Sequence, residues 1–522
     1  MTLDAAGNTI IAPTVSIQAA SFDANAADIS FTNSTATTTL ANGLVVGPQL
    51  LAQLAAIDRI ALRSRGDIHF NGELDLHVGK ELLLSGGNLL SDGSTVTIHA
   101  DRLTLANELE TPTGVAVSGN GMLNLRTGEL WFGNGQQVLS GFAQVDMAAS
   151  HGMLADGEAH LDFGAADVRL HSPLLAAGNA STTVLATTGA LSIDAANAGE
   201  QTIAAGMGGK LSLQANTLTV DSTVAAKAGV LTLKAGSGGL TVAEHGVLDS
   251  SASAKTFFDV SRYAPAGTIN LDSDGALTLA QGSVVDFSAA DGGDAGRLAI
   301  QANGDSLSLL GQLRGQARAG QRGGSVSLNS RSAVSLDALA DLFALGGINH
   351  ELNISSASGN LLLSADKRLS AGSVTLSALH GSGAADRANG NVVIDGVINA
   401  AGVKGGQISL TGRSSVQVNG ALQAAGAGGG SISLTTQGQD NGTVNQAYGY
   451  QQVEAAASGM LVIGDKAVLD AGDSGLVRWR APLLTDGRIN LQQATAASIN
   501  GQRRVEAVAS WSTTDNSSGD HH

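Results

Sequence analysis

The sequence predicts an all-β fold, a parallel β-helix or β-solenoid, with one or two short helical insertions. Glycine repeatedly opens a short strand of alternating polar and apolar residues, as in GTINLDS from Gly267, GGSVSLNS from Gly323 and GGQISLTG from Gly405. The chain has 69 Gly, which suit turns, and only 6 Pro, which would remove ladder hydrogen bonds. Aromatic residues make up only 3%, so the core must consist of small aliphatic side chains that stack in thin, regular coils.

The spacing of the glycine openings sets the expected coil. Successive openings stand roughly 16 to 30 residues apart, as expected for one coil of a β-helix. With about 20 residues in each coil and about 4.8 Å between coils, the 522 residues would form a rod on the order of 100 Å long. Such a chain grows by adding coils, so its length does not imply several globular domains.

The regularity of the repeat changes along the chain. We therefore divide it into a solenoid start (1–47), a helical insertion (48–62), degenerate coils (63–255), regular coils (256–440), looser terminal coils (441–510) and a disordered tail or tag remnant (511–522). The tail is rich in Ser, Thr, Asn and Asp, a composition that does not form a core.

Two segments have helical rather than alternating periodicity. In the segment 48–62, Leu50, Leu51 and Leu54 are spaced as on one helix face, and Pro48 stands at a position suited to a helix start. The segment that begins at Val334 shows the same spacing in Leu336, Leu339, Leu342 and Phe343. These are the expected helical insertions.

Charge and cysteine content narrow the class of protein. Lys and Arg total 28 against 45 Asp and Glu, a net charge of −17, which argues against nucleic acid and anionic membrane surfaces as partners. No apolar run is long enough to span a bilayer. Cysteine is absent, so coil stacking rather than disulfides must stabilise the fold. Since no signal peptide is visible at Met1, we interpret the chain as a segment of a longer secreted protein.

One stretch carries a family resemblance. GGQISLTGRSSVQVNGALQAAGAGG, which begins at Gly405 and ends at Gly429, resembles the repeats of filamentous haemagglutinin-like exoproteins. These are the secreted partners of Gram-negative two-partner secretion systems. The resemblance is strongest over residues 267–436. It implies a right-handed parallel β-helix, a cell-surface location, a role in adhesion and export through an outer-membrane transporter. The Asn-Pro-Asn motifs of the family's secretion domain are missing, so the transporter would recognise a segment not present here.

A triplet of cell-attachment type stands between two expected strands. Arg65, Gly66 and Asp67 form RGD, which in an adhesin suggests an integrin ligand. The competing interpretation is a turn that needs Gly and Asp for its own geometry, and it is the one we favour. Three aromatic residues, Trp131, Tyr448 and Tyr450, are candidates for glycan contact, but we favour the interpretation that they pack at the surface of the solenoid.

Other motifs point only weakly to chemistry. DGGDAG, at 291–296, occurs once and not as the repeated nonapeptide of calcium-binding β-rolls. The histidines of the first third show no H-x-x-x-H spacing, and we interpret them as single, solvated residues: His69, His77, His99, His151, His160 and His171. We expect no catalytic residue, metal site or cofactor.

The expected function is that of a structural shaft segment of a secreted, cell-surface adhesin that mediates attachment or biofilm and matrix contact. Its partners would be the transporter and a host surface or exopolysaccharide. The alternative is a β-helical polysaccharide lyase or glycoside hydrolase, for which Asp272, Asp274, Asp286, Asp291 and Asp294 would supply carboxylates. A groove with clustered carboxylates and Arg across three adjacent coils would support that alternative.

Overall fold

The protein is described by a computed structural model, and it folds almost entirely into parallel β-strands. The structure describes residues 1–5, 9–11, 15–33, 43–196, 198–289, 291–379, 388–436, 444–445, 450–451, 459–484, 486–508 and 510–511. It divides into two compact units, Met1–Gly296 with Ser308–Gln312, and Arg297–Leu307 with Leu313–His522. We call them unit 1 and unit 2 and describe each by itself.

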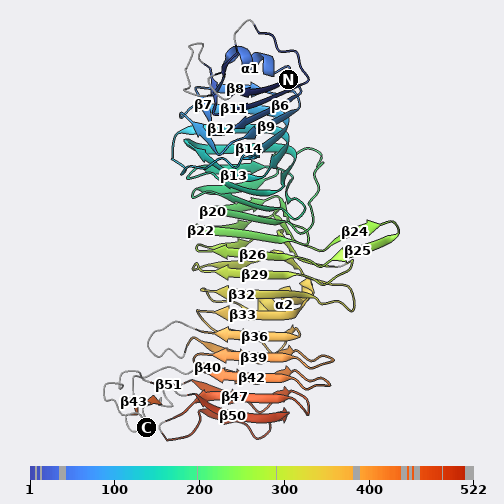
Figure 1. Cartoon of the computed structure of the whole chain (residues 1–522). Helices are drawn as coiled ribbons and strands as arrows, with labels where there is room; N and C mark the ends of the chain where they lie inside the picture. Colours follow the sequence, from blue (N-terminus) through green and yellow to red (C-terminus); the bar gives the residue numbers. More distant parts are fainter. Residues whose placement is uncertain are drawn as a thin grey trace, which may run out of the picture. The chain divides into compact units, whose positions relative to one another are not determined.

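Unit 1 is a parallel β-helix in which strands stack coil upon coil (Figure 1). The strand pairings form three ladders, one for each side of a coil. The first ladder contains β1 (Thr2–Ala5), β3 (Ser21–Ala26), β6 (Arg59–Ser64), β9 (Glu81–Ser85), β17 (Leu174–Ala177), β21 (Thr223–Ala225), β23 (Val247–Asp249) and β28 (Val284–Asp286). The second contains β2 (Thr9–Ile10), β4 (Ile29–Thr32), β5 (Leu44–Val46), β7 (Asp67–Asn71), β10 (Asn88–Ser91), β13 (Gly135–Ser140), β15 (Glu158–Asp162), β18 (Thr182–Ala186) and β26 (Thr268–Ser273). The third contains β8 (Leu74–His77), β16 (Asp167–His171), β19 (Ala190–Asp194) and β27 (Leu277–Leu279).

Five long strands turn a corner and therefore belong to two ladders each. β11 (Thr95–Ala106), β12 (Gly121–Phe132) and β14 (Phe142–Ala155) pass from the third ladder to the first. β20 (Lys210–Asp221) and β22 (Val230–Val242) pass from the second ladder to the third. Register shifts mark the corners in β12 and β20, where the paired strand contains one additional residue in β14 and two in β22.

Unit 2 repeats the three-sided coil. One ladder contains β29 (Arg297–Ala302), β32 (Gly324–Ser330), β33 (Ile348–Ser356), β36 (Ser373–Ala378), β39 (Gln407–Gly412), β42 (Ser431–Thr436), β47 (Leu476–Pro482) and β50 (Gln502–Val508). The next contains β34 (Leu361–Leu363), β37 (Asn391–Ile394), β40 (Ser415–Val418), β45 (Met460–Ile463) and β48 (Leu491–Gln493). The last contains β35 (Arg368–Ser370), β38 (Val397–Asn399), β41 (Ala421–Gln423), β46 (Val468–Asp470) and β49 (Ser498–Asn500).

The remaining strands either contain residues of both units or form small antiparallel sheets. β30 (Leu307–Leu309) and β31 (Gln312–Arg314) each contain residues of both units. β24 (Ser253–Phe257) and β25 (Val260–Ala264) form an antiparallel hairpin in unit 1. β43 (Val444–Asn445), β44 (Tyr450–Gln451) and β51 (Ser510–Trp511) form a small antiparallel sheet.

The repeated cassette forms strands whose apolar residues point inward. In β39 and β42, Ile408 lies next to Ile432 and Leu410 next to Leu434, and all four side chains are fully buried. The polar residues between them face outward, as the period of two along a strand requires. The predicted solenoid is therefore confirmed, and each coil adds one layer to an aliphatic core.

The described residues contain two helices. α2 (Leu336–Gly346) is confirmed, with Leu336, Leu339 and Phe343 buried. α1 (Pro48–Leu54) begins at the expected proline but is shorter than the predicted segment 48–62, because residues from Arg59 onward form β6. Among the described residues no helix is both long and apolar enough to cross a bilayer.

Candidate functional site

The RGD triplet lies at a corner between two ladders. Arg65 and Gly66 form the bend between β6 and β7, and Asp67 is the first residue of β7. Arg65 pairs with Asp4 at 3.0 Å, and the carboxylate of Asp67 accepts a hydrogen bond from the side chain of Asn88 at 2.5 Å. Both charged ends of the triplet therefore have partners within the protein.

Trp131 lies on an outward row of the first ladder and lines a groove of about 460 Å³ together with Asp23, Arg59, Glu81 and Arg102. The guanidinium carbon of Arg102 lies 4.8 Å from the centroid of the indole ring, and the indole N–H donates to Glu129 at 3.2 Å. One face of the ring is thus covered by a cation. The other aromatic candidates are not tested: Tyr448 lies outside the described residues, and only the backbone of Tyr450 is described, in β44.

Glu129 connects this groove to a distant part of the chain. Its carboxylate accepts hydrogen bonds from Arg102 at 2.9 Å and from the hydroxyl of Thr202 at 2.8 Å. Burial by itself would raise the pKa of Glu129, but the hydrogen bonds from Thr202, Arg102 and Trp131 outweigh it and hold the pKa below its usual value. The charged form of Glu129 is therefore favoured in the folded protein.

The aspartates named for a lyase or hydrolase do not share one face. Asp272 lies in β26 on the second ladder, next to Lys234 in the adjacent coil. Asp286 lies in β28 on the first ladder, next to Asp249, and its side chain accepts a hydrogen bond from the backbone of Ser288. Asp272 and Asp286 therefore lie on different sides of a coil and cannot act together on one glycosidic bond.

A different row of polar side chains runs along the outside of the third ladder in unit 1. Within this row His77 lies opposite His99, His99 opposite Arg126, and His171 opposite Asp194. The neighbouring row contributes Asp75 and Asp146. We call this set the His–Asp face: Asp75, His77, His99, Arg126, Asp146, His171 and Asp194.

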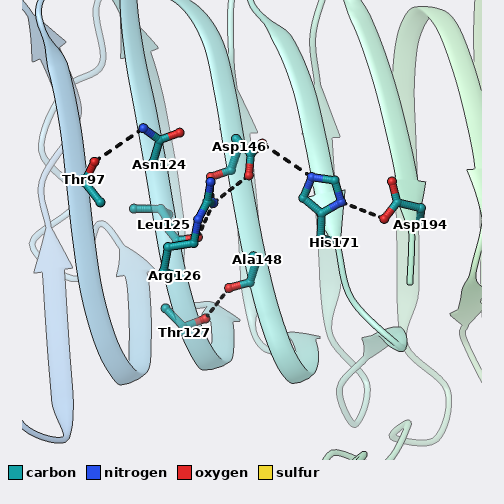
Figure 2. A network of polar contacts seen from close by, with 9 residues as sticks. All are labelled: Thr97, Asn124, Leu125, Arg126, Thr127, Asp146, Ala148, His171 and Asp194. Carbon is teal, nitrogen blue, oxygen red and sulfur yellow. Dashed lines mark hydrogen bonds and ion pairs between the residues drawn. The ribbon is translucent and has the colours of Figure 1, made fainter. Parts of the chain in front are cut away.

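The centre of the His–Asp face is a chain of contacts across four strands (Figure 2). Arg126 of β12 donates to Asp146 of β14 at 2.6 Å. Nε2 of His171 in β16 lies 3.4 Å from the other oxygen of Asp146, and Nδ1 of His171 lies 2.7 Å from Asp194 in β19. The imidazole of His171 therefore lies between two carboxylates, and one of these, Asp146, also forms an ion pair with Arg126.

A small residue creates a hollow in this face. Ala148 occupies the position in the row between Arg126 and His171, and it leaves room that a longer side chain would fill. The resulting open groove has a volume of about 770 Å³. Its polar lining includes Asp101, Arg126, Asp146 and His171. Chemically, an imidazole at such a position can hold or transfer a proton, and the guanidinium can orient an anionic group.

The expectation that the histidines stand alone is wrong for His77 and His99. Their rings stack with centroids 4.2 Å apart and planes at 4°. The two residues are 22 positions apart in the sequence, one coil in this part of the chain, so a search for ligands a few residues apart does not find them. The signal that would have found them is the repeat length itself.

A second surface feature is the hairpin β24–β25, which extends away from the stacked strands of unit 1 (Figure 1). Apolar side chains are exposed on it: Phe257, Phe258, Val260 and Tyr263. Phe258 is fully exposed and has a φ of +54°, at the first position of a two-residue turn where glycine is favoured.

No protein-family model, curated protein or solved structure matches this chain.

Proposed function

We propose that the chain is a β-solenoid segment of a secreted, cell-surface adhesin, in which the stacked coils are a scaffold and the hairpin β24–β25 makes contact. The resemblance of the repeats to filamentous haemagglutinin-like exoproteins supports this proposal, as does a net charge of −17, which suits a soluble exported chain. In this proposal the partners are an outer-membrane transporter of the two-partner secretion type and a host surface or exopolysaccharide.

The exposed hairpin is the observation that carries the proposal. Phe258 has neither packing nor a favourable backbone conformation, since a bulky side chain at positive φ is strained. Strain of this kind is retained at positions where the side chain serves a function. The adjacent Phe257 and Tyr263 extend the same apolar surface, as a contact with another surface requires.

Attachment of the purified chain to cultured cells and to immobilised exopolysaccharide tests the proposal. The double variant Phe257→Ser/Phe258→Ser should attach at least about tenfold more weakly, because exposed aromatic anchors dominate binding energy. Phe258→Gly should lose attachment while folding at least as stably, because glycine accepts the positive φ without strain. Leu345→Ser, which removes another highly exposed apolar side chain, from α2, is the matched control and should attach normally. Equal attachment by all four proteins would contradict the adhesin proposal.

A specific observation also favours the enzymatic alternative. The His–Asp face has an arginine, carboxylates and an imidazole on adjacent coils along one groove, the arrangement required of a polysaccharide lyase or glycoside hydrolase. In that alternative, His171 would exchange a proton with the substrate, Asp194 would hold the imidazole in position, and Arg126 would bind a uronate carboxylate.

Incubation with polygalacturonate, alginate and related polymers tests this second candidate. Unsaturated or reducing ends that are formed by the unaltered chain and lost in His171→Ala and Arg126→Ala would support it. Asp272→Asn, on a different ladder, is the control and should retain activity. If no polymer is cleaved, or if the His171 variant cleaves equally well, the enzymatic alternative is wrong.

A further inference from the structure

Three potential metal ligands meet at the end of the His–Asp face that is nearest the N-terminus of the chain. Asp75 and His77 both point outward from β8, two residues apart, and His99 lies opposite His77 on β11. An oxygen of Asp75 is 3.2 Å from Nε2 of His77 and 3.5 Å from Nε2 of His99. All three potential ligand atoms lie within 4.8 Å of one another.

We propose that Asp75, His77 and His99 bind a divalent transition-metal ion, with Zn²⁺ as the representative ion. Two imidazole nitrogens and one carboxylate oxygen form a ligand set that zinc, copper and nickel accept. Ligand atoms about 2.0 to 2.2 Å from a tetrahedral zinc lie roughly 3.3 Å apart, close to both distances from Asp75. Binding in this geometry requires side-chain rotation to bring the imidazole nitrogens of His77 and His99, which lie within 4.8 Å of each other, closer together.

The backbone under the three residues is fixed. Leu74 and Leu76 alternate with the ligands on β8, Val96 and Ile98 precede His99 on β11, and all four side chains are buried in the core. The parallel register therefore keeps His77 and His99 opposite each other. The backbone of the site is therefore preorganised, while the exposed side chains of Asp75 and His77 become ordered when an ion binds.

The charges around the site do not oppose a cation. Arg126 is next in the row, but its guanidinium lies against Asp146 at 2.6 Å. Lys80, three residues after His77, pairs with Asp58 at 2.7 Å. Because the site is open to solvent, water would complete the coordination, as in zinc sites with three protein ligands. His99 also lines the groove of the His–Asp face, so the ion would lie at the edge of that groove.

Titration calorimetry with ZnCl₂ tests the proposal. The starting protein carries His521→Ala and His522→Ala, so that the terminal histidine pair adds no background. We expect one equivalent of Zn²⁺ to bind, and the affinity to fall by roughly tenfold or more in His77→Ala, in His99→Ala and in Asp75→Asn, since even outer-shell changes have effects of this size. MgCl₂ should not compete, because Mg²⁺ prefers oxygen ligands.

A matched control separates a paired site from a single histidine. His245 is highly exposed and lies 3.3 Å from Asp221, the one ionic partner it has among the described residues, so His245→Ala should leave Zn²⁺ binding unchanged. Electron paramagnetic resonance with Cu²⁺ should show two coupled nitrogens in the starting protein and one in His99→Ala. Equal Zn²⁺ affinity in the His77, His99 and His245 variants, each with unchanged circular dichroism, would overturn the proposal.

Discussion

At the scale of single residues, several glycines are explained by contact between coils and not by turn geometry. Gly209, Gly229, Gly267 and Gly296 each stand at a coil corner, and each lies against a glycine of the preceding coil. A Cβ added to Gly267 would collide with the carbonyl oxygen of Gly229, although the φ of Gly267 is not positive. The sequence correctly indicated glycine corners, but the reason at these positions is close approach of the backbones.

Replacing one of these glycines should therefore destabilise unit 1. Gly267→Ala forces the backbones of two coils apart, and we expect the free energy of unfolding to fall by about 1–3 kcal/mol, as for overpacking of a core. Gly402→Ala is the control, since no atom lies within 4 Å of a Cβ added there. Urea unfolding monitored by circular dichroism measures both. An unchanged midpoint for Gly267→Ala would show that the corner has room for a methyl group.

The contribution of Glu129 to the free energy of unfolding should depend on pH. Because its pKa is lowered in the folded state, the stabilisation is fully present above the unfolded pKa, about 4.3, and is lost as the pH falls through the folded value. Glu129→Gln should lower the free energy of unfolding by about 1–3 kcal/mol at pH 7. The difference from the unaltered chain should shrink below about pH 4.

Urea unfolding at a series of pH values checks this prediction. Thr202→Val, which removes one donor to the carboxylate, should show the same dependence with a smaller amplitude. A difference between Glu129→Gln and the unaltered chain that does not change with pH would contradict the assigned role of the ionised carboxylate.

At the scale of elements, strands were predictable and the end of α1 was not. Apolar residues continue from Leu54 to Ile57 and Ile60, so the helical pattern extends into the next strand. The structure ends the helix at Leu54 because Ile60 and Leu62 alternate inward from β6, which pairs with β3 and β9. Long-range pairing outweighs a local pattern of this kind, and a single sequence does not show which coil will supply the partner strand.

α2 has end signals that its shorter counterpart lacks. The side chain of Ser335 accepts a hydrogen bond from the backbone of Ala338 at the first turn, and Gly347 ends the helix with a φ of +66°. Ser335→Ala should lower the stability of unit 2 by about 1 kcal/mol, whereas Ser335→Asp should retain it, because aspartate caps equally well. The midpoint of thermal unfolding checks both variants. If Ser335→Ala and Ser335→Asp lower the midpoint equally, the hydrogen bond between residue 335 and the backbone of Ala338 does not stabilise unit 2.

At the scale of the whole molecule, the coil period decides which side chains can act together. Three pairs of the His–Asp face join residues on successive coils: His77 with His99, Arg126 with Asp146, and His171 with Asp194. None of these pairs is close in sequence. The composition and the cassettes indicated the β-solenoid class, but the register of the degenerate coils in unit 1 had to be known before the His–Asp face could be found.

A chain of stacked coils should respond locally to a core defect. Leu410→Ala removes a fully buried side chain between Leu376 and Leu434 in unit 2, and such a change typically costs about 2–5 kcal/mol. Because each coil is stabilised mainly by its neighbours, the loss should be confined to nearby coils.

Hydrogen exchange resolved along the sequence measures this response. Amides of β36, β39 and β42 should lose protection, while those of β11, β12 and β14 in unit 1 should exchange as in the unaltered chain. Leu362→Ala, at a half-exposed position of β34, is the control and should change neither region. A uniform loss of protection in both units would instead mean that the chain unfolds as one cooperative body, and a model of independent neighbouring coils would then not describe this protein.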